Sequence, residues 1–229
     1  LAGVALLTFI FHSISSAQVL HVLWLGFCTL IRVLILIVVS SIIWVPIGVW
    51  VGMRPRVAQV VQPIAQFFAA FPANLFFPVF VIAILRFHLN VNIWTTPLMI
   101  LGTQWYILFN VIAGASLLPK DLCHVTQSFG VKGWLWWKKF ILPGIFPYYV
   151  TGAVTAAGGA WNTSIVAEVV NWGPHVLRAT GLGAYITEAS GNFPKLALGI
   201  AVMSIYVLVF NRLLWQPLYN LAQKRFQLY

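Results

Sequence analysis

The sequence predicts an all-α protein that crosses a membrane several times, and three observations lead to this class. Hydrophobic residues make up 61% of the 229-residue chain and charged residues only 7%, whereas soluble domains carry about 25% charged residues. The sequence holds three acids, Asp121, Glu168 and Glu188, so a soluble surface would expose large apolar patches. The 17 Phe, 11 Trp and 7 Tyr exclude a disordered chain, which has few large apolar side chains.

Five nearly uncharged stretches are long enough to cross the hydrocarbon core, which requires about 20 helical residues. We predict a membrane core over residues 24–221, with a preceding N-terminal membrane segment and outer loop over residues 1–23. Leu1 to Phe11 is apolar but too short to span, and we interpret it as the end of a truncated spanning helix. The predicted spans cover about 28–53, 67–86, 93–118, 143–167 and 196–218.

The basic residues are distributed unequally between the two sides of these spans. Eight lie in the turn after the first span, in the loop 119–142 and in the C-terminal tail, which we place at residues 222–229. Only Arg86, Arg178 and Lys195 fall on the other side. Because cytoplasmic loops collect Lys and Arg, the first group is predicted to be cytoplasmic and the loop 168–195 to face outward. The net charge of +10 is thus a topology signal, and nucleic acid is not an expected partner.

Sequence motifs for catalysis or metal binding are absent from the chain. It contains no G-x-x-x-x-G-K-[S/T] phosphate loop, no H-E-x-x-H and no Cys/His cluster with zinc spacing. We therefore expect no enzyme activity, no metal and no cofactor in this chain, and no disulfide between Cys28 and Cys123. Ser116 and His124 stand at i, i+8 near the cytoplasmic boundary, which leaves an intramembrane hydrolase as an alternative, although chance explains this spacing better.

A few polar and small residues inside the spans need interpretation. Arg32 lies about one turn into a span, and we expect its long side chain to extend to the outer interface. Glu168 ends a long apolar span, and two interpretations stay open: a solvated loop acid, or a gating role in an outward-facing vestibule. Gly152, Gly158 and Gly159 share one span, where they favour close helix packing over a pore lining.

The loop 119–142 has the pattern of a rigid protrusion beside the membrane. Pro119 ends a span and Gly130 permits a turn. Three tryptophans followed by two lysines then predict a helix at the membrane interface, with indoles at headgroup depth and ammonium groups in water. These residues are Trp134, Trp136, Trp137, Lys138 and Lys139.

This loop also carries a family resemblance. Gly130 is followed, after nine intervening residues, by Phe140-Ile141-Leu142-Pro143. The pattern resembles the "EAA" signature of permease subunits of binding-protein-dependent ABC importers, E-A-A-x-x-x-G, nine residues, I-x-L-P. The positions of E-A-A hold His124-Val125-Thr126, so the acid is missing; Asp121, one turn earlier, can replace it at the helix N-terminus.

Further segments resemble the nitrate/sulfonate/taurine-type group in the order that this group shows. They are Thr29-Leu30-Ile31-Arg32-Val33 with Pro46-Ile47-Gly48, Pro63 with Phe71-Pro72-Ala73 and Phe77-Pro78, and Trp161 to Glu168 with Gly181-Leu182-Gly183. The ending, Asn211 to Trp215 and then Pro217-Leu218-Tyr219, resembles the C-terminal half of a double-length permease.

The resemblance implies a type I ABC importer permease core in a bacterial inner membrane, with a cytoplasmic C-terminus. The implied partners are ABC ATPase subunits that carry ATP-Mg, a second permease half, a periplasmic solute-binding protein and membrane lipid. The implied solute is small, with an anion such as nitrate, a sulfonate or bicarbonate favoured; a secondary transporter is the alternative. The outer gate or binding-protein side is assigned to Glu168, Gly181 and Gly183. Coupling to the ATPase is assigned to Asp121, His124, Val125, Thr126, Ser128, Phe129, Gly130, Lys132, Leu142 and Pro143.

Overall fold

The structure of the protein is a computed structural model that describes residues 15–173 and 175–225. The predicted N-terminal segment 1–11 lies outside the described residues. The chain forms two compact units. Unit 1 contains residues 15–36, Ala73–Gly102 and Ala157–Phe210. Unit 2 contains Ile37–Pro72, Thr103–Ala156 and residues 211–225.

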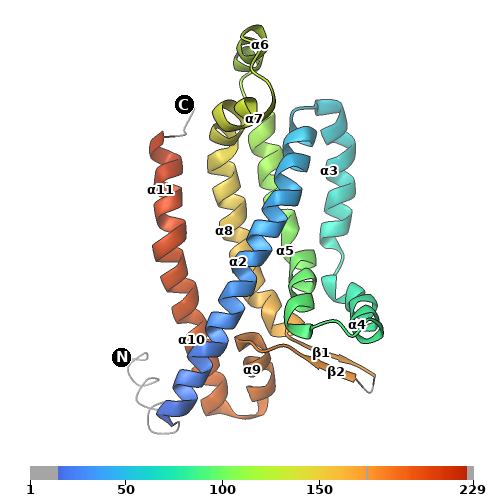
Figure 1. The fold of residues 1–229 in the computed structure, drawn as a ribbon, viewed down its shortest axis with the longest axis vertical. Helices are drawn as coiled ribbons and strands as arrows, with labels where there is room; N and C mark the ends of the chain where they lie inside the picture. The colour runs from blue at the N-terminus through green and yellow to red at the C-terminus, as the bar shows by residue number, and fades with distance from the viewer. Residues whose placement is uncertain (1–14, 174, 226–229) are drawn as a thin grey trace. The chain divides into compact units, whose positions relative to one another are not determined.

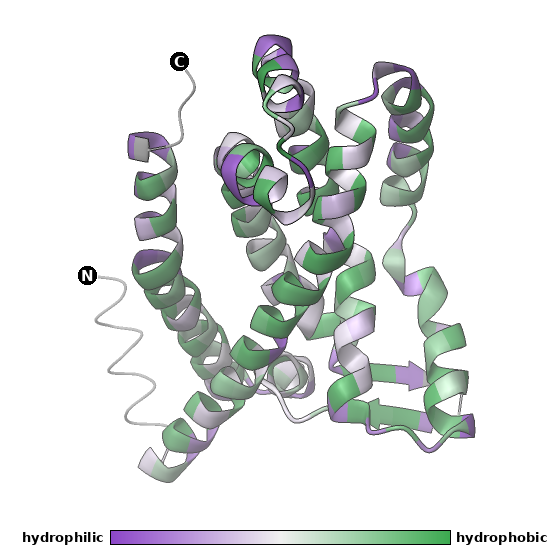
Figure 2. Cartoon of the chain, turned by 45° about the horizontal axis from the view of Figure 1, so that its top comes forward, coloured by the Kyte–Doolittle hydropathy of each residue, from purple (hydrophilic) through white to green (hydrophobic). Residues whose placement is uncertain are grey.

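Four helical segments of the described residues are long and apolar enough to cross a membrane: Ser16–Gly52, Val91–Ser116, Gly133–Ala167 and Phe193–Lys224. The first two are α2 and α5, the third runs through α7 (Gly133–Trp136) and α8 (Leu142–Ala167), and the fourth through α10 (Phe193–Phe210) and α11 (Gln216–Arg225). They are predominantly hydrophobic over most of their length, whereas α11, at the end of the fourth, also carries hydrophilic turns (Figure 2). Their composition explains the fold class, because helices satisfy every backbone group internally where water is absent.

A fifth span exists if the broken pair Pro55–Ala70 and Ala73–Arg86 counts as one. Helix α3 (Pro55–Ala70) ends before Phe71, which is extended (φ −73°, ψ 129°), and α4 (Phe77–Arg86) begins after a short 3₁₀ turn. Pro72 explains the break, since the residue before a proline is pushed out of the helical region. The predicted span 67–86 falls across this interruption.

Unit 1 has a core where the first turns of α2 meet α9 (Leu182–Glu188) and α10. Val22 and Leu25 pack there against Leu182 and Leu198. The phenol of Tyr206 donates to the backbone carbonyl of Leu23 at 2.8 Å. These contacts hold α9 between two apolar helices.

The connection between α8 and α9 contains a small antiparallel sheet, which the sequence did not predict. Strand β1 (Val169–Trp172) pairs with β2 (His175–Arg178), with Val169 opposite Arg178 and Trp172 opposite His175. The hairpin projects beside α4 and α9 within this unit (Figure 1). It brings the residues after Arg178 back to the end of α8.

Unit 2 has its core between α2, α5 and α8. Val45, Ile107, Val111 and Ile145 are among its buried residues. The close approach depends on small residues: a Cβ at Gly152 would lie 2.8 Å from the carbonyl oxygen of Tyr106. The interpretation as a packing glycine is therefore confirmed for Gly152, but it is wrong for Gly158, where a Cβ would meet nothing within 4 Å.

Helix α6 (Lys120–Ser128) extends beyond the ends of α5 and α7, as Figure 1 shows. A π-turn, Trp137–Ile141, then joins α7 to α8, and the N–H of Leu142 donates to the carbonyl of Trp137. The extra residue of a π-turn relieves the clash between a proline ring and the carbonyl four residues earlier. Here that proline is Pro143, so the helix continues past it.

Candidate functional site

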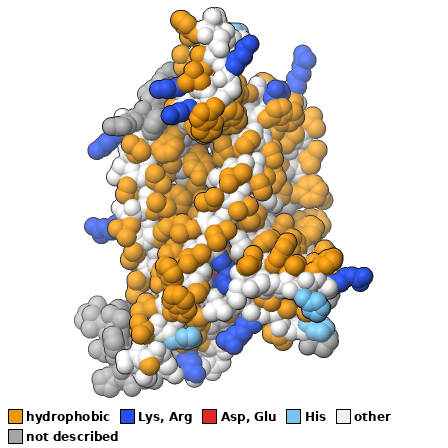
Figure 3. Space-filling model, viewed as in Figure 1, with side chains coloured by type: hydrophobic (Ala, Val, Ile, Leu, Met, Phe, Trp, Pro, Cys, Tyr) orange, Lys and Arg blue, Asp and Glu red, His pale blue; other side chains and the backbone are white. Residues whose placement is uncertain are grey.

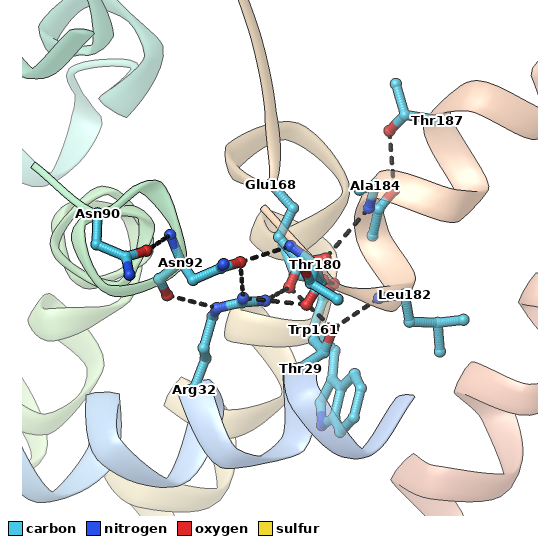
Figure 4. Close-up of polar contacts among 12 residues, drawn as sticks. Thr29, Arg32, Asn90, Asn92, Trp161, Glu168, Thr180, Leu182, Ala184 and Thr187 are labelled. Carbon is cyan, nitrogen blue, oxygen red and sulfur yellow. Dashed lines mark hydrogen bonds and ion pairs between the residues drawn. The ribbon is translucent and has the colours of Figure 1, made fainter. Parts of the chain in front are cut away.

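Unit 1 contains a buried ion pair at the end of α8. Glu168 follows the last residue of that helix and is fully buried (0% exposed). One carboxylate oxygen, Oε1, accepts hydrogen bonds from Nη1 of Arg32 and from the hydroxyl of Thr29, both at 2.8 Å. The other, Oε2, accepts from the backbone N–H of Ala184 at 3.1 Å. Figure 4 shows these groups converging from α2, α8 and α9.

The guanidinium of Arg32 is held on its remaining sides by α5 and the loop before α9. Its Nε donates to the carbonyl oxygen of Asn92 and its Nη2 to the side-chain oxygen of Asn92, both at 3.0 Å. The same Nη2 donates to the carbonyl of Thr180 at 3.0 Å. Asn92 also accepts from the backbone N–H of Thr180 at 2.7 Å. Both buried charges are thus paired and hydrogen-bonded, which is what makes their burial tolerable.

This cluster also caps α9. Gly181 is the N-cap residue and has no side chain to satisfy the first N–H groups of the helix. The Thr29 hydroxyl accepts from the N–H of Leu182 at 2.8 Å, and Glu168 accepts from that of Ala184. The carboxylate lies at the positive end of the helix, where the aligned peptide dipoles favour it.

Two glycines are required by this close packing. A Cβ at Gly181 would collide with the carboxylate of Glu168, and a Cβ at Gly183 would collide with the backbone of Ser164. The structure therefore brings together Glu168, Gly181 and Gly183, the three residues predicted on the outer side. Their assignment to an outer gate stays a prediction.

The interpretation of Arg32 as an interfacial, extended side chain is wrong: the residue is 6% exposed and ion-paired. The solvated interpretation of Glu168 is wrong as well. Burial raises the pKa of the Glu168 carboxyl, while Arg32 and the hydrogen bonds from Thr29 and Ala184 oppose the rise. The sequence held one usable signal for the pair, because an arginine inside a span needs an acid and the chain has only three. The roles of Thr29 and Asn92 had no local signal.

Unit 2 carries the loop assigned to coupling, and its centre is α6. No residue of α6 is buried. Leu122, Val125 and Phe129 are 41%, 46% and 81% exposed, and they recur at i, i+3 and i+7, which places them on one face of the helix. Cys123 contacts the core of unit 2, and burial raises the pKa of its thiol. The helix is therefore attached by one side and displays an apolar stripe.

The C-terminal end of α6 is closed by two backbone hydrogen bonds. Gly130 has a positive φ of +66°, in the left-handed region. Its N–H donates to the carbonyl of Gln127 at 3.0 Å, and the N–H of Val131 donates to that of Thr126 at 2.9 Å. These two bonds form a Schellman motif, which ends a helix where glycine supplies the left-handed residue. The predicted turn at Gly130 is present.

The other residues assigned to coupling lie on and after α6. Asp121 occupies the first turn of α6, where a negative charge is favoured. The hydroxyl of Ser128 donates to the carbonyl of His124 at 3.0 Å, and that of Thr126 to Cys123 at 2.8 Å. Lys132 precedes α7, and Leu142 and Pro143 begin α8. Figure 3 shows basic side chains gathered around α6 and α7.

The hydrolase alternative finds no support in the geometry of its two residues. The hydroxyl of Ser116 donates to the carbonyl of Ala113 at 2.8 Å, within its own helix. His124 lies on α6 and is exposed. Within residues 15–173 and 175–225 no group of three or more His, Cys, Asp or Glu side chains could hold a metal ion. Cys28 and Cys123 are both free thiols.

The fold and the family of the chain are shown by comparison with known proteins. A chain of the MetNI methionine ABC transporter, solved in inward-facing conformations, superposes with a TM-score of 0.69 at 16% identity, covering 91% of this chain and 99% of that chain. At this identity the likeness shows the fold, a type I importer permease fold. Residues 44–215 match the family described as "Binding-protein-dependent transport system inner membrane component". The chain belongs to this family and is an ABC permease.

Curated relatives come from several transport systems. The bicarbonate transport system permease protein CmpB of Synechococcus elongatus is 27% identical over 72% of this chain and 56% of its own length. The nitrate import permease protein NrtB of Leptolyngbya laminosa is 24% identical over 83% of this chain and 65% of its own length. The taurine transport system permease protein TauC of Escherichia coli is 25% identical over 77% of this chain and 62% of its own length. The chain thus spans between about half and two thirds of the length of these relatives.

Proposed function

We propose that this chain is the transmembrane subunit of an ATP-driven importer and forms the path for a small solute that a periplasmic binding protein delivers. The observation that carries the proposal is α6: a nine-residue helix with no buried residue and an apolar stripe facing away from its own unit. An isolated helix shorter than about 12 residues is marginal in water. A helix of this kind is completed by a groove on a partner.

The partner that fits α6 is an ABC ATPase subunit. Leu122, Val125 and Phe129 present the anchors of a helix-in-groove interface. Because the Schellman motif at Gly130 fixes the C-terminal end of α6, a movement of the groove would be transmitted through this end to α7 and α8. Hydrolysis of ATP-Mg would take place on that partner and no bond-making step on this chain.

A second permease half, either another copy or a fused N-terminal half, would complete the path. The relatives named for bicarbonate, nitrate and taurine favour a small anion as solute. The basic side of the chain, which carries α6 and the C-terminal helix, would face the cytoplasm, as the distribution of Lys and Arg indicates.

The test of this function is purification of the full-length protein from its own membrane. We expect an ABC ATPase in stoichiometric amount, and Phe129→Ala should reduce its recovery at least tenfold. Phe87→Ala is the matched control, because Phe87 is 67% exposed and belongs to unit 1. Wild-type protein without any nucleotide-binding partner would overturn the proposal.

Orientation is tested separately by labelling single cysteines in intact cells. In a Cys28→Ser, Cys123→Ser background, Lys195→Cys should react with a membrane-impermeant maleimide. Lys132→Cys should react only after the membrane is opened. Both positions are exposed, so the reverse pattern would invert the topology.

A further inference from the structure

Unit 2 has a cavity whose wall includes the end of the 119–142 loop. It has a volume of about 760 Å³ and lies between α2 and the segment from α7 into α8. Nine of its twelve lining residues are apolar, among them Ile42, Trp134 and Phe146. Ile42 and Trp134 are 69% and 73% exposed at its edge. The cavity therefore opens to the outside of unit 2 with a hydrocarbon-like wall.

The polar groups in this wall are few, and two of them satisfy each other. The hydroxyl of Ser41 donates to the carbonyl of Ile37 at 2.6 Å. Because its single hydrogen is used there, the phenol of Tyr149 must be the donor in the 2.9 Å contact with Ser41. The remaining polar lining residue is Lys138. A ligand here meets an apolar wall and one cation.

A second, smaller cavity of about 400 Å³ adjoins the first, since both are lined by Pro46 and Trp137. It carries a cation of its own, Arg54. The guanidinium carbon of Arg54 lies 5.1 Å from the ring centre of Trp50, and its Nη1 donates to the Trp50 carbonyl at 3.0 Å. None of the described residues that line either cavity is acidic. The pair thus combines two cations, indole rings and apolar walls.

The π-turn places an indole ring and an ammonium group in the cavity lining. Trp137 and Lys138 are its first two residues, while Phe140 and Ile141, later in the same turn, point into the core of unit 2. The turn thus supplies side chains to both the lining and the core, and Trp137 contacts both. Indoles and lysines at the end of a span match headgroup depth.

We propose that the two cavities bind one anionic phospholipid. An acyl chain of the lipid would lie against Ile42 and Phe146, and Lys138 and Arg54 would hold its phosphate. Anionic lipids are attracted by basic groups beside a span, and basic pockets between spanning helices bind their headgroups. A soluble anion would leave the apolar walls unfilled. The inference rests on the proposed orientation, which places these cations at the cytoplasmic leaflet.

The experiment is native mass spectrometry of the full-length protein in detergent, titrated with phosphatidylglycerol or with phosphatidylcholine of the same acyl chains. We expect phosphatidylglycerol to bind at least tenfold more tightly. Lys138→Gln and Arg54→Gln should each remove most of this preference, whereas Lys120→Gln, an exposed charge-matched control on α6, should keep it.

A second pair of variants tests the cavity itself. Ile42→Trp should fill its mouth and weaken binding of both lipids at least fivefold. Val38→Trp, one turn earlier on α2, lies outside the lining although it is 55% exposed, and should not. Unchanged circular dichroism shows that each variant is folded.

Three results would overturn the proposal: equal binding of the two lipids, retention of the preference in both Lys138→Gln and Arg54→Gln, or an Ile42→Cys cross-link to a second copy that excludes lipid. Loss of the ATPase partner would contradict the proposed function but leave these binding results unchanged. A reversed labelling pattern would move the site to the other leaflet without altering the lipid preference.

Discussion

The buried cluster of unit 1 and helix α6 of unit 2 place their side chains in opposite environments. Around Glu168 the polar groups point inward and are paired with one another. On α6 the apolar side chains point outward, and none of them is buried against its own unit. The cluster is complete within the chain, whereas the proposed function completes α6 with a partner. Substitutions in the first region should therefore affect stability, and those in the second should affect assembly.

The largest expected effect is on the ion pair. Glu168→Ala leaves the buried Arg32 without its counter-charge and the N–H of Ala184 without an acceptor, which should cost about 3–5 kcal/mol of stability. Glu168→Gln, which keeps the shape, should be intermediate. Asp121→Ala, an exposed acid on α6, should cost less than about 1 kcal/mol. Thermal unfolding in detergent measures all three, and equal stability of Glu168→Ala and wild type would erase the contrast between the regions.

The second effect is on α6. Val125→Asp places a charge in the apolar stripe and should weaken ATPase binding by about 2–4 kcal/mol, with little change in unfolding temperature because Val125 is 46% exposed. Gln127→Asp adds the same charge on the opposite side of the helix and serves as control. Quantitative pull-down reads out both. If the two variants lose the partner equally, the stripe is not the interface.

A smaller loss is expected at the threonine beside the ion pair. Thr29→Val keeps the shape but removes a donor to Glu168 and an acceptor for the Leu182 N–H, which should cost about 1–3 kcal/mol. Thr155→Val is the control, because that exposed hydroxyl donates only within its own helix, to Thr151. Unfolding temperatures in detergent compare them, and a Thr29→Val variant no less stable than Thr155→Val would argue against a cooperative cluster.

The smallest effects concern two helix ends of the same type. The N–H of Leu89 donates to the carbonyl of Ile84 after α4, and His88 there has a positive φ of +49°, where α6 has Gly130. Gly130→Ala should destabilise by about 1 kcal/mol, and His88→Gly should stabilise by a similar amount, because only glycine adopts this conformation without strain. Opposite shifts in unfolding temperature are expected, and shifts of the same sign would contradict this reading of the two turns.

The spans and the coupling loop were predictable because their signals are local. A run such as 93–118 carries its own hydropathy, and α5 occupies Val91–Ser116. Pro119 and Gly130 likewise mark the ends of α6 by their backbone restrictions. The hairpin was missed because its strands are only four residues long, too short for a period-of-two pattern to stand out from the apolar background.

The sequence by itself determined the membrane class, the order of the helices and the resemblance of the 119–142 loop, since each depends on residues close together in the chain. Only the tertiary structure decided what Arg32 does. Its partner is 136 residues away, and Asn92 and Thr180 come from two other segments. The environment of a buried charge is set by which helices meet around it. In a chain whose spans are all predominantly apolar, no local pattern specifies which helices meet.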